Sequence, residues 1–189
     1  MILTFTGASG TGKTSTMKRI LTMNSGAKPL TSTTTRGPRS SDAPGEYEYV
    51  SNDVFRSLVK NGKFAWKTEN FDRQYGTRRM MIDLMLESHD HLALATLDQS
   101  GVAKLHAIAV ERGCVRNAVS IYFLSPGADI LRQRLLQRRD TEEQIEKRIS
   151  MCENWDALAR NSGLPFHFLP DNGDLEEKLN FSLRTLADS

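Results

Sequence analysis

The residues best suited to chemistry form one short run, GASGTGKT, from Gly7 to Thr14. This run fits the phosphate-loop pattern Gly-x-x-x-x-Gly-Lys-Ser/Thr at every fixed position. Its glycines let backbone N–H groups approach phosphate oxygens, and the N-terminus of the following helix adds a positive dipole. The pattern predicts that Lys13 reaches the β- and γ-phosphates of a nucleoside triphosphate and that the Thr14 hydroxyl binds Mg²⁺. The candidate triphosphate-binding residues are Gly7, Ala8, Ser9, Gly10, Thr11, Gly12, Lys13 and Thr14.

A second run, STTTRGPR at 32–39, places two arginines three residues apart beside a cluster of hydroxyls. Taken alone, it has the composition of a solvated loop. An enzyme that phosphorylates a phosphate must, however, hold a second anion, and guanidinium groups bind phosphate through paired hydrogen bonds. Arg36 and Arg39 are therefore candidates for an acceptor-phosphate site, to which Tyr47 and Tyr75 can add phenolic donors.

Composition and charge limit the class of protein. The 189 residues suit one domain, and 25 basic against 23 acidic side chains leave a net charge of +2, without a field that would favour nucleic acid or membranes. The chain has no apolar run long enough to span a bilayer and no signal-peptide pattern. Cys114 and Cys152 lack the spacing of a zinc site or a disulfide framework. We expect a cytoplasmic monomer or homodimer that acts on small molecules.

Short apolar runs alternate with longer amphipathic stretches, a pattern typical of an α/β protein with a parallel central sheet. The pattern predicts strands at 2–6, 92–97, 118–124 and 165–169, with a weaker one at 28–32. Helices are predicted at 13–23, 78–88, 101–112, 127–137, 142–160 and 174–187. Residues 36–77 depart from this alternation, with a short strand at 47–50, a helix beginning after Ser51 and a strand at 64–69. We interpret this region as an inserted subdomain.

The phosphate loop occurs in GTPases, motors and kinases, and the sequence lacks the Asn-Lys-x-Asp motif by which GTPases read guanine. The acceptor segments are more specific: STTTRGPR, GEYEYV at 45–50, QYGT at 74–77, LDQSG at 97–101 and RLLQRRDTEEQIEKR at 134–148. With these segments the chain resembles the guanylate kinase family, whose members phosphorylate GMP from ATP. The resemblance implies a three-layer P-loop NTPase fold, with ATP as co-substrate and Mg²⁺ as cofactor.

The resemblance also implies how the chain is divided. Residues 1–35, 78–137 and 148–189 would form the core of a single domain, residues 36–77 a subdomain that binds the nucleoside monophosphate, and residues 138–147 a small helical lid. Carried over residue by residue, it assigns the acceptor phosphate to Arg36, Arg39, Tyr47 and Tyr75, and the guanine to Ser32, Thr77 and Asp98. Gly76 would also belong to the acceptor-binding site. Arg138 and Arg148 would close over the transferring phosphoryl group with Lys13, and Asn172 would lie beside the adenine.

Two of the departures from the family pattern bear on the acceptor site. Trp66 stands where the family has a glutamate that accepts hydrogen bonds from guanine, and an indole N–H can only donate. Glu69 or Asp72 could supply the carboxylate instead, while Trp66 could stack on the base or pack in the core. Thr96 replaces an acidic residue two positions before Asp98.

These departures leave two alternatives open. One is a kinase of the same fold for another phosphorylated acceptor, such as a different purine monophosphate or ribose 1,5-bisphosphate. The other belongs to a different class, the guanylate-kinase-like modules that bind phosphopeptides without phosphotransfer. Such modules typically lose the glycines and lysine of the phosphate loop, whereas this chain keeps GTGKT.

Overall fold

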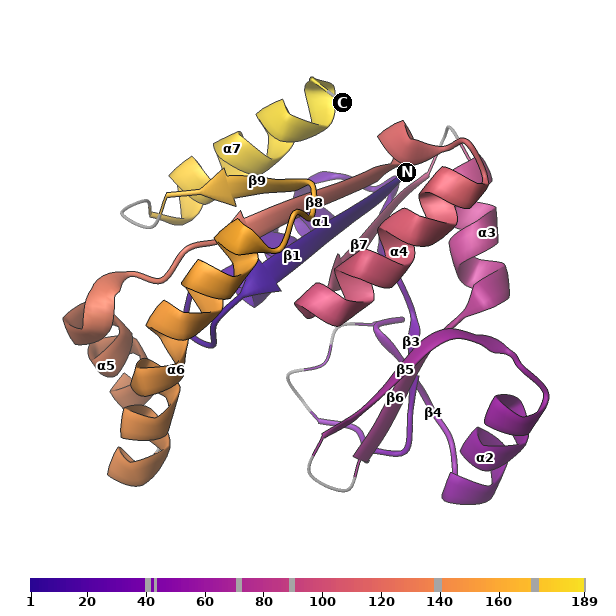
Figure 1. Ribbon diagram of the computed structural model, residues 1–189, viewed down its shortest axis with the longest axis horizontal. Helices are drawn as coiled ribbons and strands as arrows, with labels where there is room; N and C mark the ends of the chain where they lie inside the picture. The colour runs from indigo at the N-terminus through magenta and orange to yellow at the C-terminus, as the bar shows by residue number, and fades with distance from the viewer. Residues whose placement is uncertain are drawn as a thin grey trace.

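The computed structural model describes residues 1–39, 42, 44–70, 73–88, 91–137, 141–170 and 174–188. Within these residues the central sheet has five strands in the order β2-β7-β1-β8-β9 (Figure 1). The strands are β1 (Ile2–Gly7), β2 (Ala27–Pro29), β7 (Leu92–Thr96), β8 (Ala118–Phe123) and β9 (Phe166–Leu169). All neighbouring pairs are parallel, as the continuous apolar runs predict.

Helices cover both faces of this sheet. Two clusters of buried side chains lie on opposite faces of β1, because successive residues of a strand point to opposite faces. Leu3 and Phe5 pack with residues of α1 (Lys13–Met23) and α7 (Leu175–Ala187), whereas Ile2 packs with residues of α3 (Arg79–Glu87) and α4 (Gln99–Glu111). The α/β class with a central parallel sheet is therefore confirmed.

A second sheet lies beside the carboxyl end of the first and has the order β4-β3-β6-β5 in the described residues (Figure 1). Its strands are β3 (Ser32–Thr34), β4 (Tyr47–Tyr49), β5 (Phe64–Asn70) and β6 (Arg73–Arg78). The sequence pattern did not reveal β6, whose residues RQYGTR lack an apolar alternation; its strand form depends on pairing with β3 and β5.

Helix α2 (Asn52–Lys60) covers the outer end of this second sheet. It begins after Ser51, whose side chain accepts a hydrogen bond from the N–H of Val54, as the sequence predicts for an N-cap. The buried Phe55 stacks on Phe64 of β5 at a centroid distance of 4.7 Å. This contact fixes α2 against the hairpin of β5 and β6.

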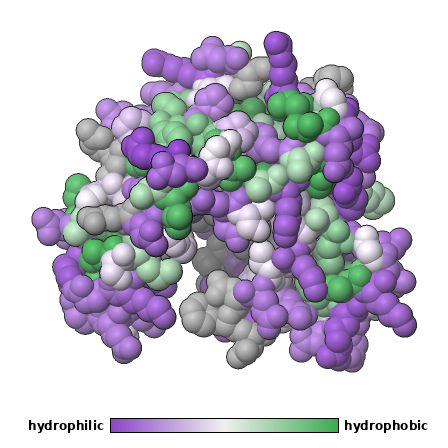
Figure 2. All heavy atoms as spheres, viewed as in Figure 1, coloured by the Kyte–Doolittle hydropathy of each residue, from purple (hydrophilic) through white to green (hydrophobic). Residues whose placement is uncertain are grey.

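Two further helices form an arm beside the loop that follows β1 (Figure 1). They are α5 (Gly127–Gln137) and α6 (Glu142–Asn161), and a 3₁₀ turn at Val115–Asn117 precedes β8. The arm rests on Ala8 through the buried side chains of Leu131, Leu135 and Ile145. Thr141 and Gln144 form a capping box that starts α6. Figure 2 shows the surface hollowed between this arm and the second sheet.

None of the helices in the described part of the chain is both long and apolar enough to cross a membrane. Cys114 and Cys152 are not joined in a disulfide. Within the same residues, no group of histidine, cysteine and acidic side chains has the arrangement of a metal site.

Candidate active site

The loop after β1 has a backbone that only glycine adopts easily. Gly7, Gly10 and Gly12 have φ angles of +137°, +90° and +98°. A Cβ atom at Gly7 would lie 2.4 Å from the carbonyl oxygen of Phe123, so a side chain there would clash with β8. Gly12 is the N-cap of α1, and the first N–H groups of that helix therefore face the loop.

Lys13 folds back over this loop. Its Nζ donates to the carbonyl oxygens of Gly7 at 2.7 Å and Ala8 at 2.5 Å, and the Thr11 hydroxyl also donates to Ala8, at 2.9 Å. The loop encloses a cavity of about 90 Å³. Lining it are Ser9, Gly10, Gly12, Lys13, Thr14 and Ser15. A cation, glycine N–H groups and hydroxyls thus surround a space suited to phosphate oxygens.

Two arginines of the arm reach the same loop. Arg148 on α6 donates from Nη1 to the Ser9 hydroxyl at 2.8 Å, and Arg134 on α5 donates from Nη1 to the Gly10 carbonyl at 3.2 Å. Sequence reasoning proposed Arg148 but missed Arg134, which belongs to the basic run at 132–139. Arg138 and Asn172, also proposed, lie outside the described residues.

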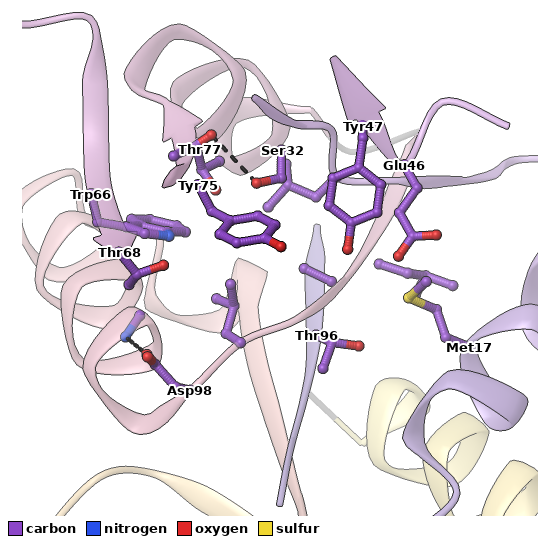
Figure 3. Close-up of a pocket in the computed structure, with 16 residues that line it drawn as sticks. Met17, Ser32, Glu46, Tyr47, Trp66, Thr68, Tyr75, Thr77, Thr96 and Asp98 are labelled. Atoms are coloured by element: carbon purple, nitrogen blue, oxygen red, sulfur yellow. Dashed lines mark hydrogen bonds between the residues drawn. The ribbon is translucent and has the colours of Figure 1, made fainter. Parts of the chain in front are cut away.

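A second cavity of about 160 Å³ lies between the second sheet and the carboxyl end of β7 (Figure 3). The proposed residues that line it are Ser32, Tyr47, Tyr75, Gly76, Thr77 and Asp98. Strand pairing brings these distant segments together, because Ser32 pairs with Thr77 in the register of β3 and β6. Thr96, the last residue of β7, and Asp98, two residues further on, line the cavity from the central sheet.

One end of this cavity carries the phenol groups of Tyr47 and Tyr75, whereas Arg36, 6% exposed, is not among the residues that line it and lies against Tyr47. The rings of Tyr47 and Tyr75 lie 6.3 Å apart, and the guanidinium of Arg36 lies 4.8 Å from the centroid of the Tyr47 ring. Burial raises the pKa of the Tyr47 hydroxyl to about 12, and the charge of the neighbouring Glu46 adds to the rise. Tyr47 therefore keeps its proton at neutral pH and can donate to an anion.

Arg36 is held by an aspartate that the sequence analysis did not consider. Asp42 accepts from Arg36 Nη2 at 2.9 Å, from the backbone N–H of Arg39 at 2.8 Å and from the Tyr49 hydroxyl at 2.6 Å. Burial alone would raise the pKa of Asp42, but these donors outweigh burial and lower it to about 2. The side chain of Arg39 is exposed outside the cavity, so Arg39 joins this arrangement through its backbone.

The opposite end of the cavity is formed by β5 and the start of α4. Trp66 is 6% exposed and packs with the core, and Thr68, two residues along the strand, lies on the same face. Asp98 caps α4, with Oδ1 accepting from the Gly101 N–H at 2.7 Å. Glu69 is exposed on the other face of β5 and does not line the cavity; Asp72 lies outside the described residues. Glu69 therefore does not supply the carboxylate that Trp66 replaces.

Comparison with known proteins agrees with this geometry. The sequence model of the guanylate kinase family matches residues 1–187. The chain belongs to this family. It is 32% identical to the guanylate kinase of Neisseria gonorrhoeae over 178 residues. This match covers 93% of this chain and 82% of that protein. It is 31% identical over 156 residues to the guanylate kinase of Rickettsia prowazekii, covering 82% and 76% of the two chains.

The fold agrees as well. The crystal structure of guanylate kinase from Anaplasma phagocytophilum matches with a TM-score of 0.70 at 20% identity, over 100% of this chain and 85% of that one. The resemblance to the guanylate kinase family that the sequence indicated is thus confirmed.

The sequence of this guanylate kinase family member did not predict several residues that line the second cavity. Glu46 adjoins Tyr47, and Thr68 follows Trp66 at a spacing of two. That spacing on a predicted strand was the available signal for Thr68, since alternate residues share a face. No comparable signal marks Met17, which lines the cavity from α1.

Proposed function

We propose that this chain transfers the γ-phosphoryl group of ATP to GMP and releases GDP and ADP. The observation that carries the proposal is the adjacency of the two cavities. Strands β1 and β7 are parallel neighbours, with Phe5 paired to Thr96. The phosphate loop after β1 and Asp98 after β7 therefore meet at the carboxyl ends of these strands. Open α/β sheets bind ligands at the carboxyl ends of their strands, and the phosphates of nucleotides bound in the two cavities can approach one another there.

The transfer needs no catalytic base. An oxygen of the acceptor phosphate is already a nucleophile; it forms a bond to the γ-phosphorus while the bond from that phosphorus to the ADP oxygen breaks. Arg36, Tyr47 and Tyr75 would hold the acceptor phosphate, and Lys13 and Arg148 would neutralise charge on the transferring group. Catalysis is then largely positioning and charge stabilisation.

The residues of the phosphate loop fit a magnesium ion. Thr14 offers a hydroxyl oxygen at the cavity of the loop, and Mg²⁺ typically takes few protein ligands when phosphate oxygens and water supply the others. Bound with ATP, the ion would neutralise phosphate charge. We also propose the remaining division of labour, in which the second sheet with α2 binds the acceptor and residues 138–147 act as a lid. The cytoplasm, which supplies both nucleotides, is the proposed compartment.

A coupled assay of ADP release tests the function. Wild-type chain and Lys13→Ala are compared with ATP and Mg²⁺ against GMP, dGMP, AMP, UMP, CMP and ribose 1,5-bisphosphate. We expect turnover on GMP and dGMP, and its loss in Lys13→Ala. A preference for ribose 1,5-bisphosphate would show that this compound, and not GMP, is the acceptor. The absence of turnover on every compound would favour a binding module.

A further inference from the structure

The indole N–H of Trp66 is a donor within the acceptor cavity. Only 6% of this residue is exposed, and its ring reaches from β5 towards the cavity (Figure 3). Among the described residues, no side chain or backbone group accepts a hydrogen bond from the indole nitrogen. The nitrogen is nevertheless accessible to solvent, because it is absent from the unpaired polar atoms that are fully buried. The N–H is therefore reachable from the cavity.

The position of this N–H is fixed by the surrounding structure. Trp66 packs in one cluster with Leu30 and Ile82, and its backbone pairs with Thr77 across β5 and β6. A buried polar group usually has a hydrogen-bond partner, because leaving one unpaired is costly. A rigid donor that lacks a protein partner and faces a substrate cavity thus points to an acceptor atom on the ligand.

The groups around Trp66 favour a base with an oxygen acceptor. Ser32, Thr68 and Thr77 bring hydroxyls that donate or accept, and one oxygen of Asp98 already accepts from the Gly101 N–H. At this end of the cavity the indole is a fixed donor and Asp98 brings a carboxylate, whereas the carboxylate of Glu46 lies beside Tyr47 at the other end.

We propose that Trp66 is a specificity-determining residue whose indole N–H donates a hydrogen bond to the 6-oxo oxygen of a purine monophosphate. This inference rests on the proposed function and names its substrate class, the 6-oxopurine nucleotides. The indole cannot accept from the 2-amino group of guanine, which leaves the second oxygen of Asp98 as the carboxylate acceptor for that group. IMP, which lacks the group, should therefore be phosphorylated with a kcat/KM within about tenfold of that for GMP.

The first test measures binding without chemistry. Trp66→Phe keeps an aromatic ring and removes the N–H, so we expect the Kd for GMP to rise about tenfold while the KM for ATP is unchanged. Trp155→Phe is the matched control, since Trp155 lies on α6, 41% exposed, and is the other tryptophan of the chain. In that control Trp66 is the sole tryptophan, and its fluorescence should change saturably when GMP is added without ATP.

The second test changes the ligand, so it does not depend on how well Trp66→Phe folds. The monophosphate of 2-aminopurine riboside lacks the 6-oxo oxygen, and wild-type chain should bind it about tenfold more weakly than GMP. Trp66→Phe should bind both ligands alike. Equal wild-type affinity for the two ligands, or a Trp66→Phe variant with the wild-type Kd for GMP, would overturn the inference and leave Trp66 a packing residue.

The proposed function and the role of Trp66 can be refuted separately. An absence of turnover on every monophosphate, together with tight fluorescence-detected binding of GMP, would refute the proposed function and still test the contact of Trp66. Turnover on GMP with a preference over IMP of more than about a hundredfold would keep the function and refute the proposed base recognition.

Discussion

Asp42 and Lys13 carry opposite charges in the two halves of the site, and each accepts or donates hydrogen bonds within its own half. Asp42 gathers donors from Arg36, Arg39 and Tyr49, whereas the ammonium of Lys13 lies against the carbonyls of the phosphate loop. Substitutions at these positions should therefore change the binding of one substrate without disturbing the other.

Asp42→Asn should raise the KM for the acceptor about tenfold and leave the KM for ATP unchanged, because an amide replaces the charge-assisted bond to Arg36 with a weaker one. Steady-state kinetics with each substrate varied in turn measures the split. Asp53→Asn is the control, since Asp53 is an exposed carboxylate in the first turn of α2. An equal rise in both KM values would show that Asp42 serves the fold rather than the acceptor site.

At the scale of elements, the hairpin of β5 and β6 supplies most of one wall of the acceptor cavity. Trp66 and Thr68 on β5 pair with Thr77 and Tyr75 on β6, so one register decides which four side chains share the cavity face. Close packing between the strands protects that register. A Cβ atom built at Gly76 would lie 2.6 Å from the ring of Phe64.

Gly76→Ala should therefore force Phe64 to move, lowering the free energy of unfolding by about 1–3 kcal/mol and raising the KM for the acceptor. Urea denaturation measures the first effect. Gly37→Ala is the control for stability, because a Cβ atom there meets nothing within 4 Å. A Gly76→Ala variant as stable as wild type would mean that the ring adapts without cost.

Helix α4 and strand β8 enclose a histidine whose ionisation couples stability to pH. His106 Nε2 lies 3.0 Å from the Ser120 hydroxyl, which is 2.7 Å from that of Thr4. Burial lowers the pKa of His106, with a further contribution from the charge of His167. The folded chain thus keeps the imidazole neutral at a pH where the unfolded chain binds a proton.

The free energy of unfolding should fall as the pH drops through the ordinary histidine value of about 6.5, because the unfolded state then binds more protons. The fall should end only below the lowered pKa of the folded state. Denaturation curves between about pH 8 and 5 measure it. His106→Gln should flatten this part of the profile and the exposed His91→Gln should not; an unchanged slope in His106→Gln would assign the coupling elsewhere.

The whole molecule has three parts that must meet for chemistry: the phosphate loop on the central sheet, the arm of α5 and α6, and the second sheet. The arm already touches the loop through Arg134 and Arg148, while the surface is hollowed between the arm and the second sheet (Figure 2). Excluding water from phosphoryl transfer requires these parts to come together over the nucleotides.

Small-angle X-ray scattering should accordingly give a smaller radius of gyration with GMP and a non-hydrolysable ATP analogue than with the chain alone. GMP by itself should produce only part of the decrease, because it engages the second sheet and not the arm. An unchanged radius with both ligands at saturation would indicate a site that works without closure.

The amino-acid sequence by itself determined the features that depend on neighbouring residues. The phosphate loop is one contiguous run, so its pattern predicts the backbone turns of Gly7, Gly10 and Gly12, and the alternation of apolar runs predicts the parallel sheet. The acceptor motifs indicated the family, which the comparisons confirm.

The tertiary structure decided which side chains of each loop and strand face the site. It turned the side chain of Arg39 outwards, brought Asp42 to Arg36, and placed Glu69 on the outer face of β5. It also made a strand of β6, which has no apolar alternation of its own. The physical reason is that a β-strand exposes alternate residues to alternate sides, so only the pairing of β5 with β6, and of β6 with β3, determines which side chains enter the cavity.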